Sequence, residues 1–274
     1  MAGDFDVTPF PVSRRTIVAV GAASARRRRM IGLIEVDVTE ARQRMAAARA
    51  AGLATPSLTA FVVACTGRAV SEHPEVAAAR DLRGRIVTFR TADAAVSVEV
   101  DLEGRSFPLT HVLRDIGNRA AADLDRELHA VKADPGSSAT LRLGPAAGIF
   151  LRFPGFLRVA AFRLLSRLPH LQRRLMGTIG ITSVGMFGRG GGWGIAFPVH
   201  PLSIVVGGLA VRPGYRDGNL EPREMLALTL SFDHDVVDGA PAARFTERLR
   251  GSLESAEGLA VPTPPDPGTA EAGG

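Results

Sequence analysis

One short segment near the end of the chain places a histidine among carboxylates. Residues 226–245, LALTLSFDHDVVDGAPAARF, contain Asp233, His234, Asp235 and Asp238. This pattern fits a metal site, a catalytic base with its supporting acid, or a strand end followed by a capped helix. A metal site is disfavoured, because the other histidines have no ligand-type spacing to one another and Cys65 is the only cysteine.

Side-chain alternation separates the members of this segment. Residues 224–234 are predicted to form the last strand, and successive side chains of a strand point to opposite faces. His234 then continues the apolar stripe that includes Phe232, whereas Asp233 and Asp235 share the other face. We therefore expect His234 to be partly buried, which favours the neutral imidazole, and the two aspartates to be bystanders.

Asp238 lies four residues beyond His234, across a turn. The sequence DGAPAARF is typical of a helix start, with Pro241 near the first helical position. Two interpretations stay open. Asp238 caps this helix, or it holds the turn that aims His234, through a salt bridge or turn hydrogen bonds.

The charge of the chain is positive and unevenly placed. The formal net charge is +5, and the stretch from Pro135 to Arg216 contains arginines but no Asp or Glu. A block of one sign predicts an anionic partner: a nucleotide-bearing cofactor, an acidic carrier protein or an anionic membrane surface. Nucleic acid is not expected, because aromatic residues for base stacking are scarce.

Composition also predicts the class of protein and its cellular compartment. Hydrophobic residues make up 46% of the 274 residues, which predicts a globular protein. A single cysteine provides no disulfide framework and fits a reducing, cytoplasmic compartment. No signal-peptide core and no uncharged apolar stretch of about 18 residues is present, so no membrane span is expected.

The expected elements alternate between helices and strands and predict an α+β fold. A strand at 30–39 leads into a helix capped by Thr39, and Ser57 is expected to cap a buried helix. Two or three strands are predicted within 84–110, a long helix at 111–134, a strand at 195–199 and a final helix at 240–257. We expect a flexible lead-in at 1–9, one domain at 10–258 and a disordered tail at 259–274.

Residues 145–176 interleave large apolar residues with arginines, and Pro154 and Pro169 divide the helical pattern. Two interpretations fit this segment. It is an apolar insertion that covers the core, or a basic amphipathic element at a membrane interface or beside a long-chain acyl site.

Several segments resemble, in order, the catalytic domain of the dihydrolipoamide acyltransferases of 2-oxoacid dehydrogenase complexes. DHDVVDGAPAARF is similar to the family's His-x-x-x-Asp-Gly signature, and GTIGITSVGMFG to its Gly-Thr-Phe-Thr-Ile-Ser-Asn-Leu-Gly segment. IEVDVTEARQRM, LTAFVVACTGRAVSEHPEVAAA and VSVEVDLEGRSFPLTHVLRD resemble further parts of the same domain. The resemblance covers roughly residues 10–258 and implies a chloramphenicol acetyltransferase-like two-layer sandwich with a mixed β-sheet.

The resemblance implies transfer of an acyl group between two thiols, typically coenzyme A and a lipoyl group, with coenzyme A as a substrate. His234 would take the proton of the attacking thiol, and a hydroxyl donor would stabilise the oxyanion. The matching donor position is Thr182, 52 residues before His234. Ser183 is the second candidate donor and a candidate cofactor-binding residue. An ordinary strand residue is the other interpretation of Thr182.

The resemblance also assigns a structural role to Asp238, through Arg14 or Arg15 of the SRRT segment. The chain departs from the family in three places. Lys132 lacks the Asp-Lys-Ala setting of a lipoylated turn, Asp235 replaces the family's usual arginine, and residues 140–176 do not resemble the family's linker. We expect no lipoyl domain, subunit-binding segment or Pro/Ala linker ahead of the core.

We therefore expect a stand-alone catalytic core with no lipoyl group attached to it. Its expected partners are acyl-CoA, a lipoyl or acyl-carrier protein, and further copies of itself in a homotrimer or larger assembly with active sites between subunits. Peripheral membrane contact through 145–176 is a further prediction. The alternatives are an acyltransferase for a hydroxyl, amine or lipid acceptor, and a non-catalytic structural core of the same fold.

Overall fold

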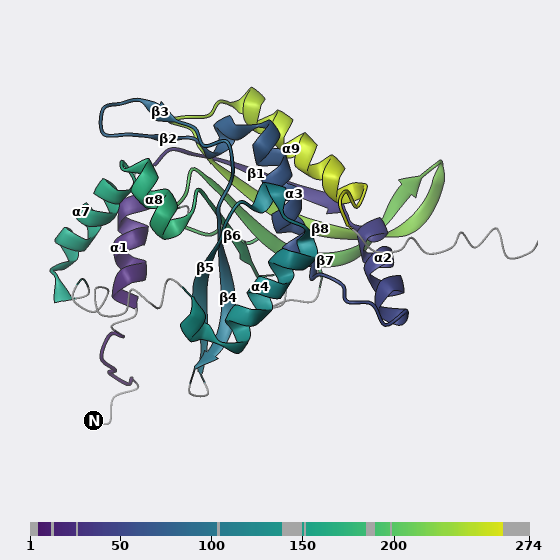
Figure 1. Cartoon of the computed structure of the whole chain (residues 1–274), viewed down its shortest axis with the longest axis horizontal. Helices are drawn as coiled ribbons and strands as arrows, with labels where there is room; N and C mark the ends of the chain where they lie inside the picture. The colour runs from purple at the N-terminus through teal and green to yellow at the C-terminus, as the bar shows by residue number, and fades with distance from the viewer. Residues whose placement is uncertain are drawn as a thin grey trace, which may run out of the picture.

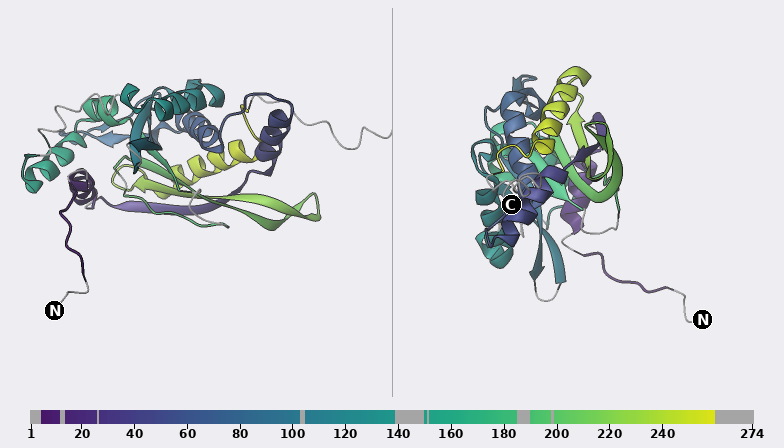
Figure 2. Two further views of the ribbon diagram at one scale, coloured as in Figure 1. Left: turned by 90° about the horizontal axis from the view of Figure 1, so that it is seen from below. Right: turned by 90° about the vertical axis from the view of Figure 1, so that its right-hand side faces the viewer.

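The computed structural model describes residues 5–11, 14–25, 27–102, 105–138, 150, 152–184, 190–197 and 199–259. These residues form two layers, with helices packed on one face of a mixed six-stranded sheet (Figure 1; Figure 2, left). The predicted α+β fold with a mixed sheet is therefore confirmed.

The sheet has the strand order β1-β8-β7-β6-β4-β5. Strand β6 runs parallel to its neighbours β4 and β7, and the other pairs are antiparallel. The bounds are β1 Arg29–Asp37, β4 Ala94–Leu102, β5 Arg105–Leu113, β6 Ile179–Ser183, β7 Leu202–Arg216 and β8 Asn219–Asp233. A separate two-stranded sheet joins β2, Ala79–Arg80, to β3, Ile86–Val87.

Four helices cover the inner face of the large sheet, and their apolar sides form the core with it. They are α2 Thr39–Ala50, α3 Leu58–Glu72, α4 Ala121–Ala133 and α9 Gly239–Glu254. Helix α3 is buried on most sides, and the Ser57 hydroxyl caps it by accepting a hydrogen bond from the Ala60 amide, as predicted. Gly67 lets the backbone of a 3₁₀ turn at Ile116–Asn118 approach α3, because a Cβ at this position would lie 2.6 Å from the Ile116 carbonyl carbon.

Three further helices gather at one end of the sheet (Figure 1): α1 Arg14–Ser24, α7 Gly155–Leu165 and α8 Pro169–Met176. Pro154 immediately precedes α7 and Pro169 lies in the first turn of α8, so the two prolines divide this segment as predicted. His200 holds the end of α8, because its Nε2 lies 2.8 Å from the Met176 carbonyl oxygen. Burial lowers the pKa of His200 to about 4, so this ring is neutral and donates from Nε2.

Some predicted elements differ from the structure. The helix predicted from residue 111 begins only at Ala121, because residues 111–113 complete β5. Residues 195–197 form no strand. Helix α1, Arg14–Ser24, was not predicted, and Thr39 begins α2 without capping it, because Val38 occupies the cap position. The remaining α-helices agree with the prediction within a few residues. Residues 260–274 of the predicted tail, 1–4 of the lead-in, and 140–149 and 151 of the atypical segment lie outside the described residues.

None of the helices in the described part of the chain is long and apolar enough to cross a membrane.

Candidate active site

His234 lies in the turn that follows β8. The strand ends at Asp233, whose carbonyl accepts hydrogen bonds from the amides of Val236 and Val237. The His234 amide donates to the Arg28 carbonyl, 2.9 Å away, which fixes the turn against the start of β1. The histidine is therefore held by backbone hydrogen bonds on both sides of the turn.

The expected burial of His234 is wrong. Its side chain is 48% exposed, whereas Phe232 is buried and Asp233 is only 8% exposed. Strand alternation stops at Asp233, so the turn carries the imidazole out of the apolar stripe. The Asp233 carboxylate instead lies 3.5 Å from the guanidinium of Arg27, whose side chain is 17% exposed.

The hydrogen bond of the imidazole sets its tautomer. Nδ1 of His234 lies 3.0 Å from the Val237 carbonyl oxygen, which can only accept. The neutral ring therefore carries its proton on Nδ1 and its lone pair on Nε2. Within the described residues no hydrogen bond is made to Nε2, so this nitrogen is available to accept a proton from a ligand.

Asp238 lies beside the imidazole and precedes α9. Its Oδ1 is 3.8 Å from His234 Nδ1, and its side chain is 90% exposed and makes no capping hydrogen bond. Neither Arg14 nor Arg15 forms an ion pair with it in the part of the chain that the structure describes. The Val237 carbonyl, and not Asp238, is therefore the group that the imidazole Nδ1 contacts at hydrogen-bond distance.

Thr182 and Ser183 end the short strand β6. Thr182 is in register with Val205 of β7, which is in register with Thr229 of β8 and then with Leu33 of β1. Ile181, one position earlier, packs in the core beneath the helices. Because faces alternate, Thr182 belongs to the outer face of the sheet and Ser183 to the helix-covered face.

The structure does not bring Thr182 and His234 together within one chain. His234 lies five residues beyond Thr229 along β8, and Thr229 is two strands from Thr182. A strand rise of about 3.4 Å per residue and a strand spacing of about 4.8 Å place the two Cα atoms roughly 20 Å apart. A site that uses both residues must be completed by a second copy of the chain.

Thr182 and Ser183 instead border an open groove of about 470 Å³ at the far end of β4 and β6. The N-terminus of α3 contributes Ser57 and Thr59 to this groove, and α4 contributes His129 and Lys132. Neither Thr182 nor Ser183 makes a side-chain hydrogen bond in the described part of the chain, so both hydroxyls remain available to a ligand.

The arginines that lead into and begin β1 are functional candidates that the sequence reasoning missed. Arg29 donates to the carbonyls of His200 and Pro201 at 2.8 and 3.1 Å, and burial lowers its pKa to about 10. Arg28 lies 3.5 Å from Asp235. The signal was the run of four arginines at 26–29, which precedes a strand pairing with the histidine strand. In the described residues no group of three metal-ligating side chains occurs.

Comparison with known proteins gives a family for this region. Residues 171–261, which include Thr182, His234 and Asp238, match the model of the 2-oxoacid dehydrogenases acyltransferase catalytic domain. This part of the chain resembles the 2-oxoacid dehydrogenase acyltransferases. The predicted resemblance is thereby confirmed, and the match includes two of its motifs, at 177–188 and 233–245.

Among curated relatives, the lipoamide acyltransferase component of the branched-chain alpha-keto acid dehydrogenase complex of Pseudomonas aeruginosa is 43% identical over 81 residues. These are 28% of this chain and 18% of that protein. The succinyltransferase component of the human mitochondrial 2-oxoglutarate dehydrogenase complex is 34% identical over 78 residues, 28% of this chain and 17% of that protein. The match thus spans less than a fifth of these acyltransferases.

Solved acyltransferase cores share the fold over nearly the whole chain. A probable dihydrolipoamide acetyltransferase from Listeria monocytogenes has a TM-score of 0.67 at 18% identity and covers 96% of this chain and 100% of its own. The Azotobacter vinelandii dihydrolipoamide acetyltransferase has a TM-score of 0.68 at 20% identity, with 94% and 95% covered. At these identities the similarity establishes the fold.

Proposed function

We propose that this protein transfers an acyl group from a thioester to an acceptor thiol, with His234 as the general base. The observation that carries the proposal is the 3.0 Å contact from His234 Nδ1 to the Val237 carbonyl. It holds the proton on Nδ1 and presents the lone pair of Nε2, half exposed, to an incoming thiol.

The reaction follows from these groups. Nε2 of His234 takes the proton of the acceptor thiol, and the sulfur attacks the thioester carbonyl carbon to give a tetrahedral oxyanion. A hydroxyl of Thr182 donates a hydrogen bond to this oxygen. The carbon–sulfur bond to the donor then breaks, and the departing thiolate recovers the proton from Nε2.

A second copy of the chain supplies Thr182 in this proposal. Thr182 lies on the outer face of the sheet, where Ile31 and Leu33 of β1 are 46% and 52% exposed. Such apolar side chains on a sheet face support a homotrimer or larger assembly. The Azotobacter vinelandii acetyltransferase, studied for the roles of a serine, a histidine and an asparagine in its mechanism, spaces them by 52 and 4 positions. Thr182, His234 and Asp238 have the same spacings.

The substrates are proposed from the relatives. Their names identify lipoamide or dihydrolipoyllysine residues as substrates. We therefore propose acyl-CoA as one thioester and a lipoyl group or acyl-carrier protein on a partner as the other. Ser183 faces the groove beside Thr182 and is proposed to contact coenzyme A there. The cytoplasmic location and the single domain at 10–258 remain predictions.

The test is a screen of purified protein with acyl-CoA donors against thiol, amine and hydroxyl acceptors. Transfer to dihydrolipoamide, lost in His234→Ala and kept in the exposed-surface variant Arg126→Gln, supports the proposal. Transfer to amines or hydroxyls but not to thiols would contradict the thiol acceptor and favour one of these groups as the acceptor. Coenzyme A binding without transfer to any acceptor would indicate a non-catalytic core.

A second candidate, an acceptor presented at a membrane, is favoured by helix α7. This helix has no buried residue, and Phe156 and Leu164 are 72% and 51% exposed. Arginines flank these side chains and no acid occurs from Pro135 to Arg216, which suits an anionic lipid surface. Co-sedimentation with anionic liposomes, lost in Phe156→Ser/Leu164→Ser, supports this candidate. Equal sedimentation of the variant and the wild type would contradict membrane contact and favour α7 as an insertion that covers the core.

A further inference from the structure

A pocket beside the His234 turn collects arginines from separate parts of the chain. It has a volume of about 330 Å³ and is bordered by both aspartates that flank His234. Its charged and polar lining residues are Arg27, Arg80, Arg163, Ser166, Arg167, Gln172, Asp233 and Asp235. We call it the arginine pocket. Helices α7 and α8, which belong to the segment unlike the family's linker, form one wall.

The positive charge of the arginine pocket is not balanced by the protein. Four arginines face two aspartates, and those aspartates are already paired, Asp233 with Arg27 and Asp235 with Arg28, each at 3.5 Å. The three remaining arginines are Arg80, Arg163 and Arg167, and they form no ion pair within the described residues. Unpaired like charges gathered in one concave site create a potential that attracts an anion.

Arg27 gives this charge a fixed position. Its side chain is only 17% exposed. Burial lowers the pKa of its guanidinium, and the nearby charge of Arg167 lowers it further, against the opposing effect of Asp233. An anion in the pocket would offset the repulsion between the charges of Arg27 and Arg167. Binding of an anion would therefore reduce the electrostatic repulsion within the pocket.

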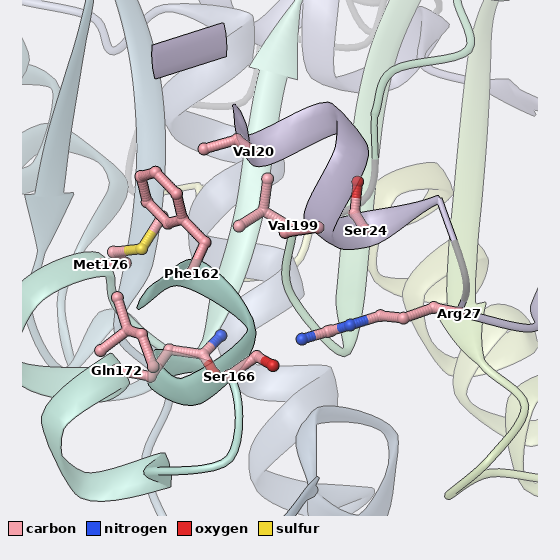
Figure 3. Close-up of a pocket in the computed structure, with 10 residues that line it drawn as sticks. Val20, Ser24, Arg27, Phe162, Ser166, Gln172, Met176 and Val199 are labelled. Carbon is pink, nitrogen blue, oxygen red and sulfur yellow. The ribbon is translucent and has the colours of Figure 1, made fainter. Parts of the chain in front are cut away.

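Gln172 is an independent sign of a missing ligand. The residue is 4% exposed, and its side-chain oxygen is buried without a hydrogen-bond partner in the described part of the chain. Figure 3 shows Gln172 and Ser166 on one side of a neighbouring narrow cavity and Arg27 reaching toward them from the other. These three residues line both spaces. Oε1 only accepts, so a ligand satisfies it with a group that donates, such as a protonated phosphate oxygen, while Nε2 of the same carboxamide donates to an anion.

We propose that the arginine pocket binds the phosphate group of a small ligand. Guanidinium groups bind phosphate oxygens with two parallel charge-assisted hydrogen bonds, and several converging arginines fit a tetrahedral anion better than a single carboxylate. The Gln172 Nε2 adds a neutral donor, whereas the Ser166 hydroxyl already donates to the Arg163 carbonyl oxygen at 2.7 Å. Because Asp233 and Asp235 border the pocket, the bound phosphate lies next to the His234 turn. This site does not depend on the acyl-transfer proposal.

Titration calorimetry of the whole chain with inorganic pyrophosphate at low ionic strength tests the site. The double variant Arg163→Gln/Arg167→Gln is expected to weaken binding on the order of tenfold or more, because two charge-assisted contacts are lost. Gln172→Leu is expected to weaken it by about threefold to tenfold. The matched control is Arg174→Gln, an exposed arginine of the same segment that does not line the pocket, and its affinity should stay within about twofold.

Two outcomes overturn the proposal. One is the absence of pyrophosphate binding to the folded protein. The other is an equal loss of affinity in Arg174→Gln, which would show unspecific attraction to a basic surface. Circular dichroism melting of each variant separates loss of binding from loss of folding. Competition by coenzyme A would assign the phosphate to a nucleotide-bearing substrate, and competition by phosphatidic acid vesicles would assign it to a lipid headgroup. Either result supports the site.

Discussion

Two inactive variants of this protein should restore activity when their chains assemble together. The reasoning rests on the separation of roughly 20 Å between Thr182 and His234 within one chain, worked from strand rise and spacing along the register. No thioester carbonyl can contact both residues across this distance. The proposed reaction therefore requires each active site to take His234 from one copy and Thr182 from its neighbour, as in a closed cyclic assembly.

The magnitude follows from random mixing. In a 1:1 mixture of Thr182→Val and His234→Ala chains, a site is intact only when the histidine comes from the first variant and the threonine from the second. This combination occurs in about a quarter of the sites. Thr182→Val alone is expected to retain about 1% of wild-type turnover or less, because an oxyanion donor contributes on the order of 10²- to 10³-fold.

Coexpression of the two differently tagged variants, tandem purification and an acyl-transfer assay give the measurement. Tandem purification removes assemblies that contain only one variant, and the turnover is corrected for this loss. A corrected turnover near a quarter of the wild-type value supports a site between chains. The double variant carrying both changes in one chain, coexpressed with itself, is the control and should stay inactive. Turnover of the mixed assembly no higher than that of either variant alone would refute the reasoning.

Three further predictions concern the framework of the site. Gly67→Ala should lower the free energy of unfolding by about 1–3 kcal/mol in urea titration, because the new Cβ meets the Ile116 backbone at 2.6 Å; an unchanged value would contradict that close approach. The hydrogen bond from Arg248 lowers the pKa of Glu257 from 4.5 to about 2. The ionised Glu257 therefore stabilises the fold at pH values above 4.5, and this stabilisation is lost as the pH falls toward 2. Glu257→Gln should then cost about 1 kcal/mol at pH 6, with the difference shrinking at acid pH, and a pH-independent difference would oppose this. Gln172→Leu should raise the melting temperature or leave it unchanged, because it removes a buried acceptor without a partner; a marked decrease would show that the carboxamide is already satisfied.

Local patterns predicted the parts of the fold whose cause is local. Ser57 before a run of apolar residues predicted the capped, buried helix α3, and the alternating residues before Asp233 predicted β8. The prolines at 154 and 169 marked where α7 and α8 separate. In each case the residues that decide the element lie within it or next to it.

The rest depends on contacts between distant segments. Burial of His234 was predicted by extending strand alternation one residue too far, and the turn that ends the strand is fixed by the carbonyls of Arg28 and Asp233. The separation of Thr182 from His234 follows from strand order, which spacing along the chain does not contain. The arginine pocket likewise joins Arg27 and Arg80 to α7 across the fold.

The central claim is that His234 removes the proton of an acceptor thiol, and the pH dependence of His234→Ala tests it most directly. Without the base, only thiol that is already ionised reacts, and an ordinary thiol has a pKa near 8.5. The account predicts that kcat/KM of the variant, measured with acyl-CoA and dihydrolipoamide, is about 10²- to 10⁴-fold below wild type at pH 6.5. It also predicts about a tenfold rise per pH unit up to about pH 8.5. A variant whose rate and pH profile match those of the wild type would contradict the claim.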